Sequence, residues 1–209
     1  MPGRRNTECQ PGCNTPTLGV ILATIMELQT KRLKLVELIF ADLENIHQLH
    51  SLPETDKYNT LGIPATIQET ENILNEWLNL QKAIPRISHI LCLRQLDSSQ
   101  FIGLIGLTLG KVNYKIAEIW YKIFPNFWRQ GLTTEALTEI LKFGFTDLGL
   151  HRIEAGCAVE NIASIKVLEK AGMTKEGCKR KFLPLKEQWA DNYIYGILDS
   201  DFGKMKIKV

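Results

Sequence analysis

One strongly periodic helix, bounded by a glycine at each end, constrains the fold of this chain more than any other feature. Its apolar face repeats at steps of three and four residues, through Leu137, Ile140, Leu141, Gly144, Phe145 and Leu148. Gly131 precedes the helix, and Gly149 stands where a glycine commonly ends one. Strand-like segments lie on both sides, at 114–124 and 151–159. This order predicts helices packed against a sheet.

The remaining periodicities predict further strands and helices around the same sheet. Alternating apolar residues predict a first strand at 32–38, and Asp42 begins a short amphipathic stretch. Thr66 and Glu69 form the pattern of a capping box at the start of a second helix. A later helix is predicted to begin after Asn161, its N-cap, and to end before Gly172, its C′ residue. Strand patterns occupy the other apolar segments, 87–93, 101–110, 174–183 and 188–198, of which the last two form a hairpin-like pair.

Together these elements predict an α/β (α+β) fold with a mixed, mostly antiparallel sheet and about four flanking helices. One domain is expected to extend over residues 27–209. Residues 1–26 are interpreted as an N-terminal appendage that is disordered or outside the core, because MELQTKRLKL, from Met26, looks like a natural beginning.

Composition narrows the possible classes of function. The chain has 209 residues, a net charge of +2 and 44% hydrophobic residues, so neither nucleic acid nor a membrane surface is an expected partner. No apolar run reaches the roughly 20 residues that span a bilayer. The five cysteines match no zinc pattern, so we expect reduced thiols, no metal and a cytoplasmic location. A monomer or homodimer is expected.

The glycine turn before the periodic helix is the best candidate for a binding site. In PNFWRQGLTTEAL (125–137), Gly131 would let the backbone approach an anion closely at the positive end of a helix. The alternative is an ordinary loop before a helix. A second glycine-rich segment, GLTLGKVN (106–113), fits a hairpin turn better than a nucleotide-binding loop. It lacks Ser or Thr after Lys111 and precedes a strand.

Three blocks of the sequence, in this order and spacing, resemble one known family. The blocks are PNFWRQGLTTEAL, LHRIEAGCAVENIASIKVLEKAGMTKEG and QWADNYIYGIL. They are similar to the GNAT superfamily of acetyl-CoA-dependent N-acetyltransferases, in particular to the bacterial ribosomal-protein alanine N-acetyltransferases. The resemblance covers nearly all the chain from Thr30 onward. It implies an enzyme, an acyltransferase that moves an acetyl group from acetyl-CoA directly to a primary amine.

The resemblance also implies how acetyl-CoA is held. In the family, a loop of the form Arg/Gln-x-x-Gly-x-Gly/Ala binds the CoA diphosphate through backbone N–H groups. The corresponding residues here are Trp128, Arg129, Gln130, Gly131, Leu132 and Thr133, of which the first and last depart from the pattern. The strand 117–124 would splay from 151–159 and pair with the pantetheine arm around Ile123. Asn161 would hold the same arm, and it can cap its helix at the same time.

Acetyl transfer to an amine requires a neutral amine and a proton for the departing thiolate. The tyrosine that serves as the acid in many family members would fall at Leu168, so it is missing. Ser164 is the candidate acid, and an ordinary polar residue of a first helical turn is the alternative. Glu118 is the candidate base, and a solvated strand residue is the alternative. His47 and His50 are interpreted as surface residues of a short helix.

The expected acceptor follows from the pKa of the amine. An α-amine has a pKa of about 8 and is partly neutral near pH 7, whereas the neutral fraction of a lysine amine with a pKa of about 10.4 is lower by a factor of a few hundred. A site without a certain base therefore favours a protein or peptide N-terminus. Two alternatives remain open: a small-molecule amine, such as a polyamine or antibiotic, and a CoA-binding module without catalysis.

Overall fold

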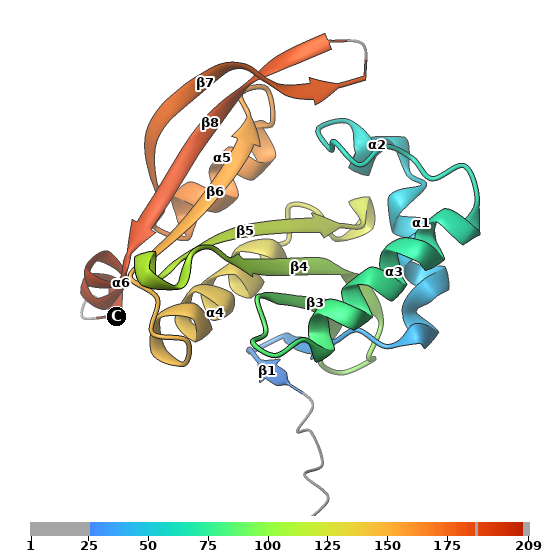
Figure 1. Ribbon diagram of the computed structural model, residues 1–209, viewed down its shortest axis with the longest axis horizontal. Helices are drawn as coiled ribbons and strands as arrows, with labels where there is room; N and C mark the ends of the chain where they lie inside the picture. Colours follow the sequence, from blue (N-terminus) through green and yellow to red (C-terminus); the bar gives the residue numbers. More distant parts are fainter. Residues whose placement is uncertain (1–25, 187, 207–209) are drawn as a thin grey trace, which may run out of the picture.

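The computed structural model describes residues 26–186 and 188–206. Eight strands form one sheet in the order β1-β2-β3-β4-β5-β6-β8-β7 (Figure 1). The strands are β1 (Glu27–Gln29), β2 (Leu33–Glu37), β3 (Ser88–Gln95), β4 (Phe101–Leu109), β5 (Ile116–Ile123), β6 (Arg152–Ala158), β7 (Thr174–Leu185) and β8 (Gln188–Leu198). The α-helices are α1 (Leu43–His50), α2 (Pro53–Asp56), α3 (Ile67–Lys82), α4 (Leu132–Thr146), α5 (Ile162–Lys170) and α6 (Asp199–Lys206).

The predicted sheet is confirmed. Every neighbouring pair of strands is antiparallel except β5 and β6, which are parallel. The prediction of an appendage at residues 1–26 falls, apart from Met26, outside the described residues. That prediction and the assignment of 27–209 to one domain stay predictions.

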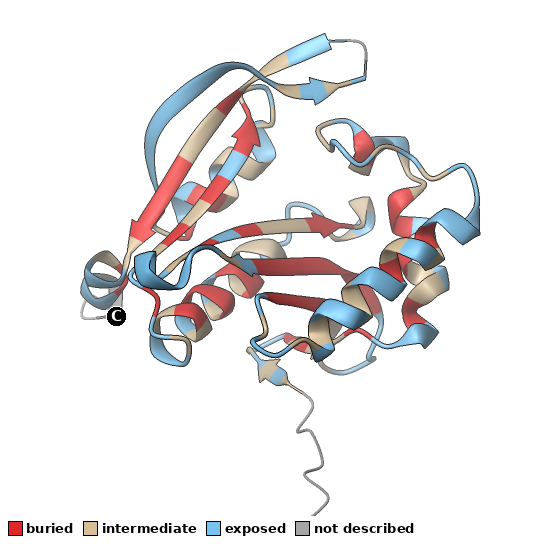
Figure 2. Ribbon diagram, in the orientation of Figure 1, coloured by how far each residue is buried: buried red, intermediate tan, exposed pale blue. Residues whose placement is uncertain are grey.

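Each face of the sheet is covered by its own hydrophobic core. On one face, α4, α5 and α6 bury apolar side chains against the strands, and the α4 residues of this core include Leu137, Ile140 and Leu141. On the other face, α1 and α3 pack Ile46, Leu49 and Leu74 against β3 and β4. The buried residues in Figure 2 accordingly concentrate in the central strands and on the sheet-facing side of α4. The periodic helix of the sequence therefore lies where its pattern placed it.

Local capping chemistry fixes several helix ends as expected. The Thr66 hydroxyl accepts a hydrogen bond from the N–H of Glu69, although the Glu69 carboxylate reaches back to Ala65 rather than to Thr66 itself. Asn161 caps α5, and Gly172 follows that helix at φ +84°. These caps satisfy N–H and C=O groups that the ends of a helix leave unpaired.

Six α-helices flank the sheet in the described residues, whereas the sequence predicted about four. The two additional helices are α2 and α6. With only four residues, α2 is too short to show a helical period, and α6 follows β8 directly and has little apolar pattern beyond Phe202. The three-residue strand β1 was also not predicted, because it is too short to show alternation.

Candidate active site

The defining feature of the site is the early parting of β5 from β6. The two strands pair only over residues 116–118 and 152–154, after which they diverge (Figure 1). This confirms the expected splay. It occurs in the middle of the sheet, where both strands remain paired with β4 and β8 on their outer sides.

The hydrogen-bond alternation of β5 shows which backbone groups face this gap in the pairing. The N–H of Phe124 donates to the carbonyl of Ile102 on β4, so even-numbered residues of β5 bond to β4. Odd-numbered residues turn their N–H and C=O groups toward β6. Tyr121 and Ile123, beyond the last β6 partner, therefore direct backbone groups into the gap.

The opposite wall follows from the pairing of β6 with β8. The N–H of Val159 donates to Asp191, so the odd-numbered residues of β6 bond to β8 and the even-numbered ones face β5. Gly156 and Ala158 thus line the gap, and the Ala158 carbonyl accepts a hydrogen bond from the N–H of Asn161 at 2.9 Å. Neither strand has a partner strand across the gap, so an extended ligand can pair with the backbone groups that remain free there, although the carbonyls of Ala158 and Ile123 already accept hydrogen bonds.

The loop between β5 and α4 carries the predicted anion-binding residues together at the start of α4. Arg129 and Gly131 both have left-handed backbone conformations, with φ of +60° and +76°, and Gly131 is the N-cap of α4 without a side-chain cap. Within the described part of the chain, no N–H group from Gln130 to Thr134 donates a hydrogen bond. This cluster of free donors includes the backbone of Leu132 and Thr133.

Two carbonyl groups at this loop accept hydrogen bonds from its side chains. The indole N–H of Trp128 donates to the Ile123 carbonyl at 2.8 Å, and the Gln130 amide donates to the Asn126 carbonyl at 2.8 Å. These contacts hold the backbone that leads to the free N–H groups at the helix start. The exposed Arg129 side chain makes no such loop contact in the described structure.

Asn161 and Ser164 lie at the start of α5, beside the gap. The Asn161 side-chain oxygen accepts a hydrogen bond from the N–H of Ser164 at 3.1 Å, so the capping role of Asn161 is confirmed. The Tyr121 hydroxyl donates to the carbonyl of Ser164 at 3.4 Å and so spans from β5 to α5. Burial raises the pKa of Tyr121, which keeps it protonated. No pattern in the sequence had indicated a functional role for Tyr121.

Glu118 is the last residue of β5 that pairs with β6, and it lies opposite Glu154. Its side chain is exposed, whereas Ala117 and Ile119 on either side are buried in the core beneath α4. Glu118 therefore lies on the opposite face of the sheet from Tyr121.

The expectation that His50 is a surface residue is wrong. His50 is 2% exposed and its ring packs edge-on against Trp77, because α1 turns this side chain toward the sheet. Burial lowers the pKa of His50 to about 4, so the ring is neutral at physiological pH. His47 is half-buried, and its Nδ1 lies 2.8 Å from the Thr70 hydroxyl.

The segment around α2 forms the wall of the site on the face that carries Glu118. The Tyr58 hydroxyl donates to the Glu160 carbonyl at 3.1 Å and so connects this segment to the turn between β6 and α5. Lys122 is buried beneath it, and burial lowers the pKa of this amine to about 8, against the opposing effect of Asp56. A cavity of about 530 Å³ lies between α1, α2 and residues 124–126.

Comparisons with known proteins place this geometry in a family. The model of the acetyltransferase (GNAT) domain matches residues 32–174. The uncharacterized N-acetyltransferase YnaD of Bacillus subtilis is 32% identical over 179 residues, which are 85% of this chain and 99% of the relative. The chain belongs to the GNAT acetyltransferase family and is an N-acetyltransferase that uses acetyl-CoA as its acetyl donor.

Two solved structures of similar fold contain coenzyme A. Spermidine N-acetyltransferase from Vibrio cholerae, in complex with CoA and spermine, has a TM-score of 0.74 at 23% identity and covers 83% of this chain and 99% of its own. The ribosomal L7/L12 α-N-protein acetyltransferase RimL, in complex with CoA, has a TM-score of 0.76 at 18% identity and covers 84% and 100%. Because these two enzymes differ in acceptor, the fold does not choose between a polyamine and a protein.

Among the described residues, no group of three or more His, Cys, Asp or Glu side chains could hold a metal ion. No helix in that same part of the chain is both long and apolar enough to cross a membrane.

Proposed function

We propose that this N-acetyltransferase acetylates the N-terminal α-amine of a protein or peptide. The observation that carries the proposal is the charge of β7, which has four basic residues, Lys175, Lys179, Arg180 and Lys181, and one acidic residue, Glu176. Glu176 is already paired with Arg152. A polyamine is a polycation and would be repelled by this strand, whereas a peptide N-terminus with neutral or acidic residues after it would not.

The basic strand lies close to the reaction gap. Lys179 pairs in register with Asn192 of β8, which pairs with Ala158 of β6 at the edge of the gap. Two strand spacings place Lys179 about 10 Å from β6. Residues 174–182 of β7 are exposed, as the pale colour of this strand in Figure 2 illustrates. A peptide that delivers its amine to the gap would therefore pass within reach of these charges.

We further propose that residues 128–133 hold the CoA diphosphate and that Ile123 and Asn161 hold the pantetheine arm. The free N–H groups from Gln130 to Thr134 support the first assignment, since an anion at a helix start needs such donors. The edge of β5 at Tyr121 and Ile123 supports the second, because it has no partner strand and an extended arm can pair with its N–H groups, while the Ile123 carbonyl already accepts from Trp128. Leu132 contributes only its backbone, since its side chain is buried.

Gly131→Asp should raise the Kd for acetyl-CoA by about 100-fold, because a carboxylate at the helix start would repel the diphosphate. Gly149→Asp is the matched control, since Gly149 also has a positive φ, +62°, and open space around it, but lies beyond the other end of α4. Isothermal titration calorimetry measures both affinities. Equal Kd values for the two variants would contradict the assignment of the loop.

For the chemistry, we propose Ser164 as the acid that protonates the departing thiolate, and Tyr121 is the second candidate because its hydroxyl reaches the same turn. General acids contribute about 100-fold or more to a rate. We expect Ser164→Ala to lower kcat by about 100-fold in steady-state assays with saturating acetyl-CoA, and Tyr121→Phe to change it little. The reverse pattern would transfer the role of acid to Tyr121.

Glu118 is proposed as the base that deprotonates the amine. At pH 7 most of an α-amine is protonated, so Glu118→Gln should lower kcat/KM by about tenfold, whereas above pH 8 the amine is neutral without help and the deficit should shrink. A pH profile of both proteins from 6.5 to 9 measures this. A deficit that stays constant across the range would exclude Glu118 as the base.

The acceptor class is tested by transfer of labelled acetyl groups. We expect label on peptides with a free N-terminus, more on those with acidic second and third residues, and little on spermidine or on N-terminally blocked peptides that contain lysine. Lys179→Glu combined with Arg180→Glu should reverse the preference between acidic and basic peptides. Lys142→Glu is the control, because it also replaces a positive charge by a negative one, but on the outer side of α4. Faster transfer to spermidine than to every peptide would favour the polyamine alternative.

A further inference from the structure

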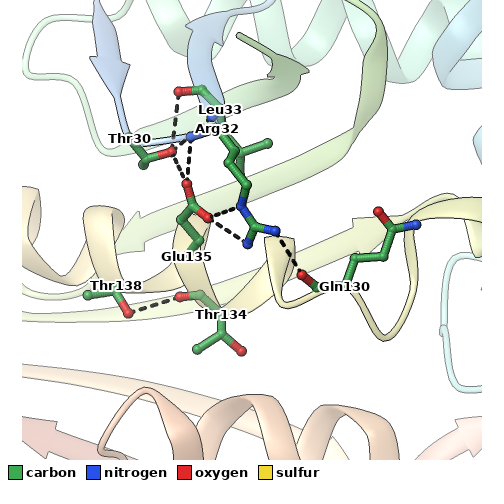
Figure 3. Close-up of polar contacts among 7 residues, drawn as sticks. All are labelled: Thr30, Arg32, Leu33, Gln130, Thr134, Glu135 and Thr138. Carbon is green, nitrogen blue, oxygen red and sulfur yellow. Dashed lines mark hydrogen bonds and ion pairs between the residues drawn. The ribbon is translucent and has the colours of Figure 1, made fainter.

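A network of hydrogen bonds ties the start of the chain to the loop before α4 (Figure 3). Arg32 and Thr30 lie in the turn between β1 and β2, about 100 residues away in sequence from their partners, Gln130 and Glu135. Glu135 lies in the first turn of α4. The network therefore joins the edge of the sheet to the segment proposed to hold the diphosphate.

The Glu135 carboxylate holds Arg32 in a fixed orientation. One oxygen accepts from the Thr30 hydroxyl at 2.6 Å and from the backbone N–H of Arg32 at 2.8 Å. The other accepts from Nε and Nη2 of Arg32, both at 2.7 Å. Partial burial opposes ionisation of Glu135, but the hydrogen bonds from Thr30 and Arg32 outweigh it and lower the pKa. One carboxylate oxygen thus holds the guanidinium, and the other holds Thr30 and the backbone of the turn that carries Arg32.

The remaining nitrogen of that guanidinium contacts the loop itself. Nη1 of Arg32 donates to the carbonyl oxygen of Gln130 at 3.0 Å. A trans peptide is planar, so the N–H of the next residue points opposite to the carbonyl. Holding the Gln130 carbonyl toward Arg32 therefore directs the N–H of Gly131 away from Arg32.

We propose that Arg32 is a positioning residue for acetyl-CoA: it fixes the peptide between Gln130 and Gly131 so that the Gly131 N–H donates to the diphosphate. This rests on the proposed role of residues 128–133. Arg32 acts through the loop, and Glu135 acts through Arg32. Gly131 has a left-handed conformation, and glycine adopts a wider range of φ than other residues, so an outside contact that selects one orientation of this peptide has a direct effect on binding.

Simple charge attraction makes a different prediction from positioning, and Glu135 distinguishes them. Glu135 is a negative charge near the anion site, so removing it should tighten acetyl-CoA binding if charge alone matters. If Glu135 orients Arg32, removing its charge should weaken binding instead. Arg32→Lys gives a second contrast, because lysine keeps the charge but cannot contact Glu135 and Gln130 together as the planar fork does.

The experiment measures the Kd for acetyl-CoA by calorimetry in the full chain. We expect Arg32→Ala, Arg32→Lys and Glu135→Gln each to raise the Kd about tenfold, and the Arg32→Ala/Glu135→Gln double variant to be no weaker than Arg32→Ala alone. Lys31→Ala, the neighbouring exposed cation, should leave the Kd unchanged. Turnover with S-acetylpantetheine, which lacks the diphosphate, should be unaffected in all of these variants.

Three results would overturn the inference. Tighter binding by Glu135→Gln, or full affinity in Arg32→Lys, would reduce Arg32 to a nearby charge. An unchanged Kd with a lowered melting temperature would make the network purely structural. Gly131→Asp in the same series separates this failure from that of the loop assignment: if Gly131→Asp abolishes binding while the Arg32 and Glu135 variants do not weaken it, only the positioning role fails.

Discussion

The parting of β5 and β6 is the constraint on which the rest of the site depends. Both strands keep their outer partners, β4 and β8, so the sheet remains intact. The pairing between β5 and β6 themselves ends after residues 118 and 154. Unpaired strand edges inside a domain are costly unless a ligand or water takes the hydrogen bonds. The gap between Tyr121, Ile123, Gly156 and Ala158 is thus the place where backbone groups are available to the ligand that we propose.

The loop before α4 continues the same principle. Its carbonyl groups at Ile123, Asn126 and Gln130 each receive a side-chain donor, from Trp128, Gln130 and Arg32 in turn. What remains at the start of α4 is a set of N–H groups and the positive end of a helix. This explains why Trp128 can stand where the family pattern has Arg or Gln: it contributes a hydrogen bond that shapes the loop. In this loop the side chains hold the backbone in place, and under our proposal the backbone N–H groups bind the cofactor.

Much of the fold could be predicted because its signals are local. The period of α4, the cap at Asn161 and the glycines after α4 and α5 depend on neighbours within a few residues. Contacts over long sequence distances left no such signal. Arg32 and Glu135 are separated by 103 positions, and each is an unremarkable charged residue in its own segment. His50 was misjudged for the same reason, since only the packing of α1 against Trp77 buries it. Tyr121 became a candidate only once α5 lay beside β5.

The sequence by itself determined most of the elements, the family and the glycine turn, because periodicity, caps and a spaced motif are properties of short segments. Tertiary structure decided which backbone groups are free, which side chains hold the loop and which charges lie beside the gap. Hydrogen bonding and burial are settled by what each group meets in space, and residues such as Arg32, Gln130 and Glu135 meet only when the sheet brings the turn before β2 against the start of α4.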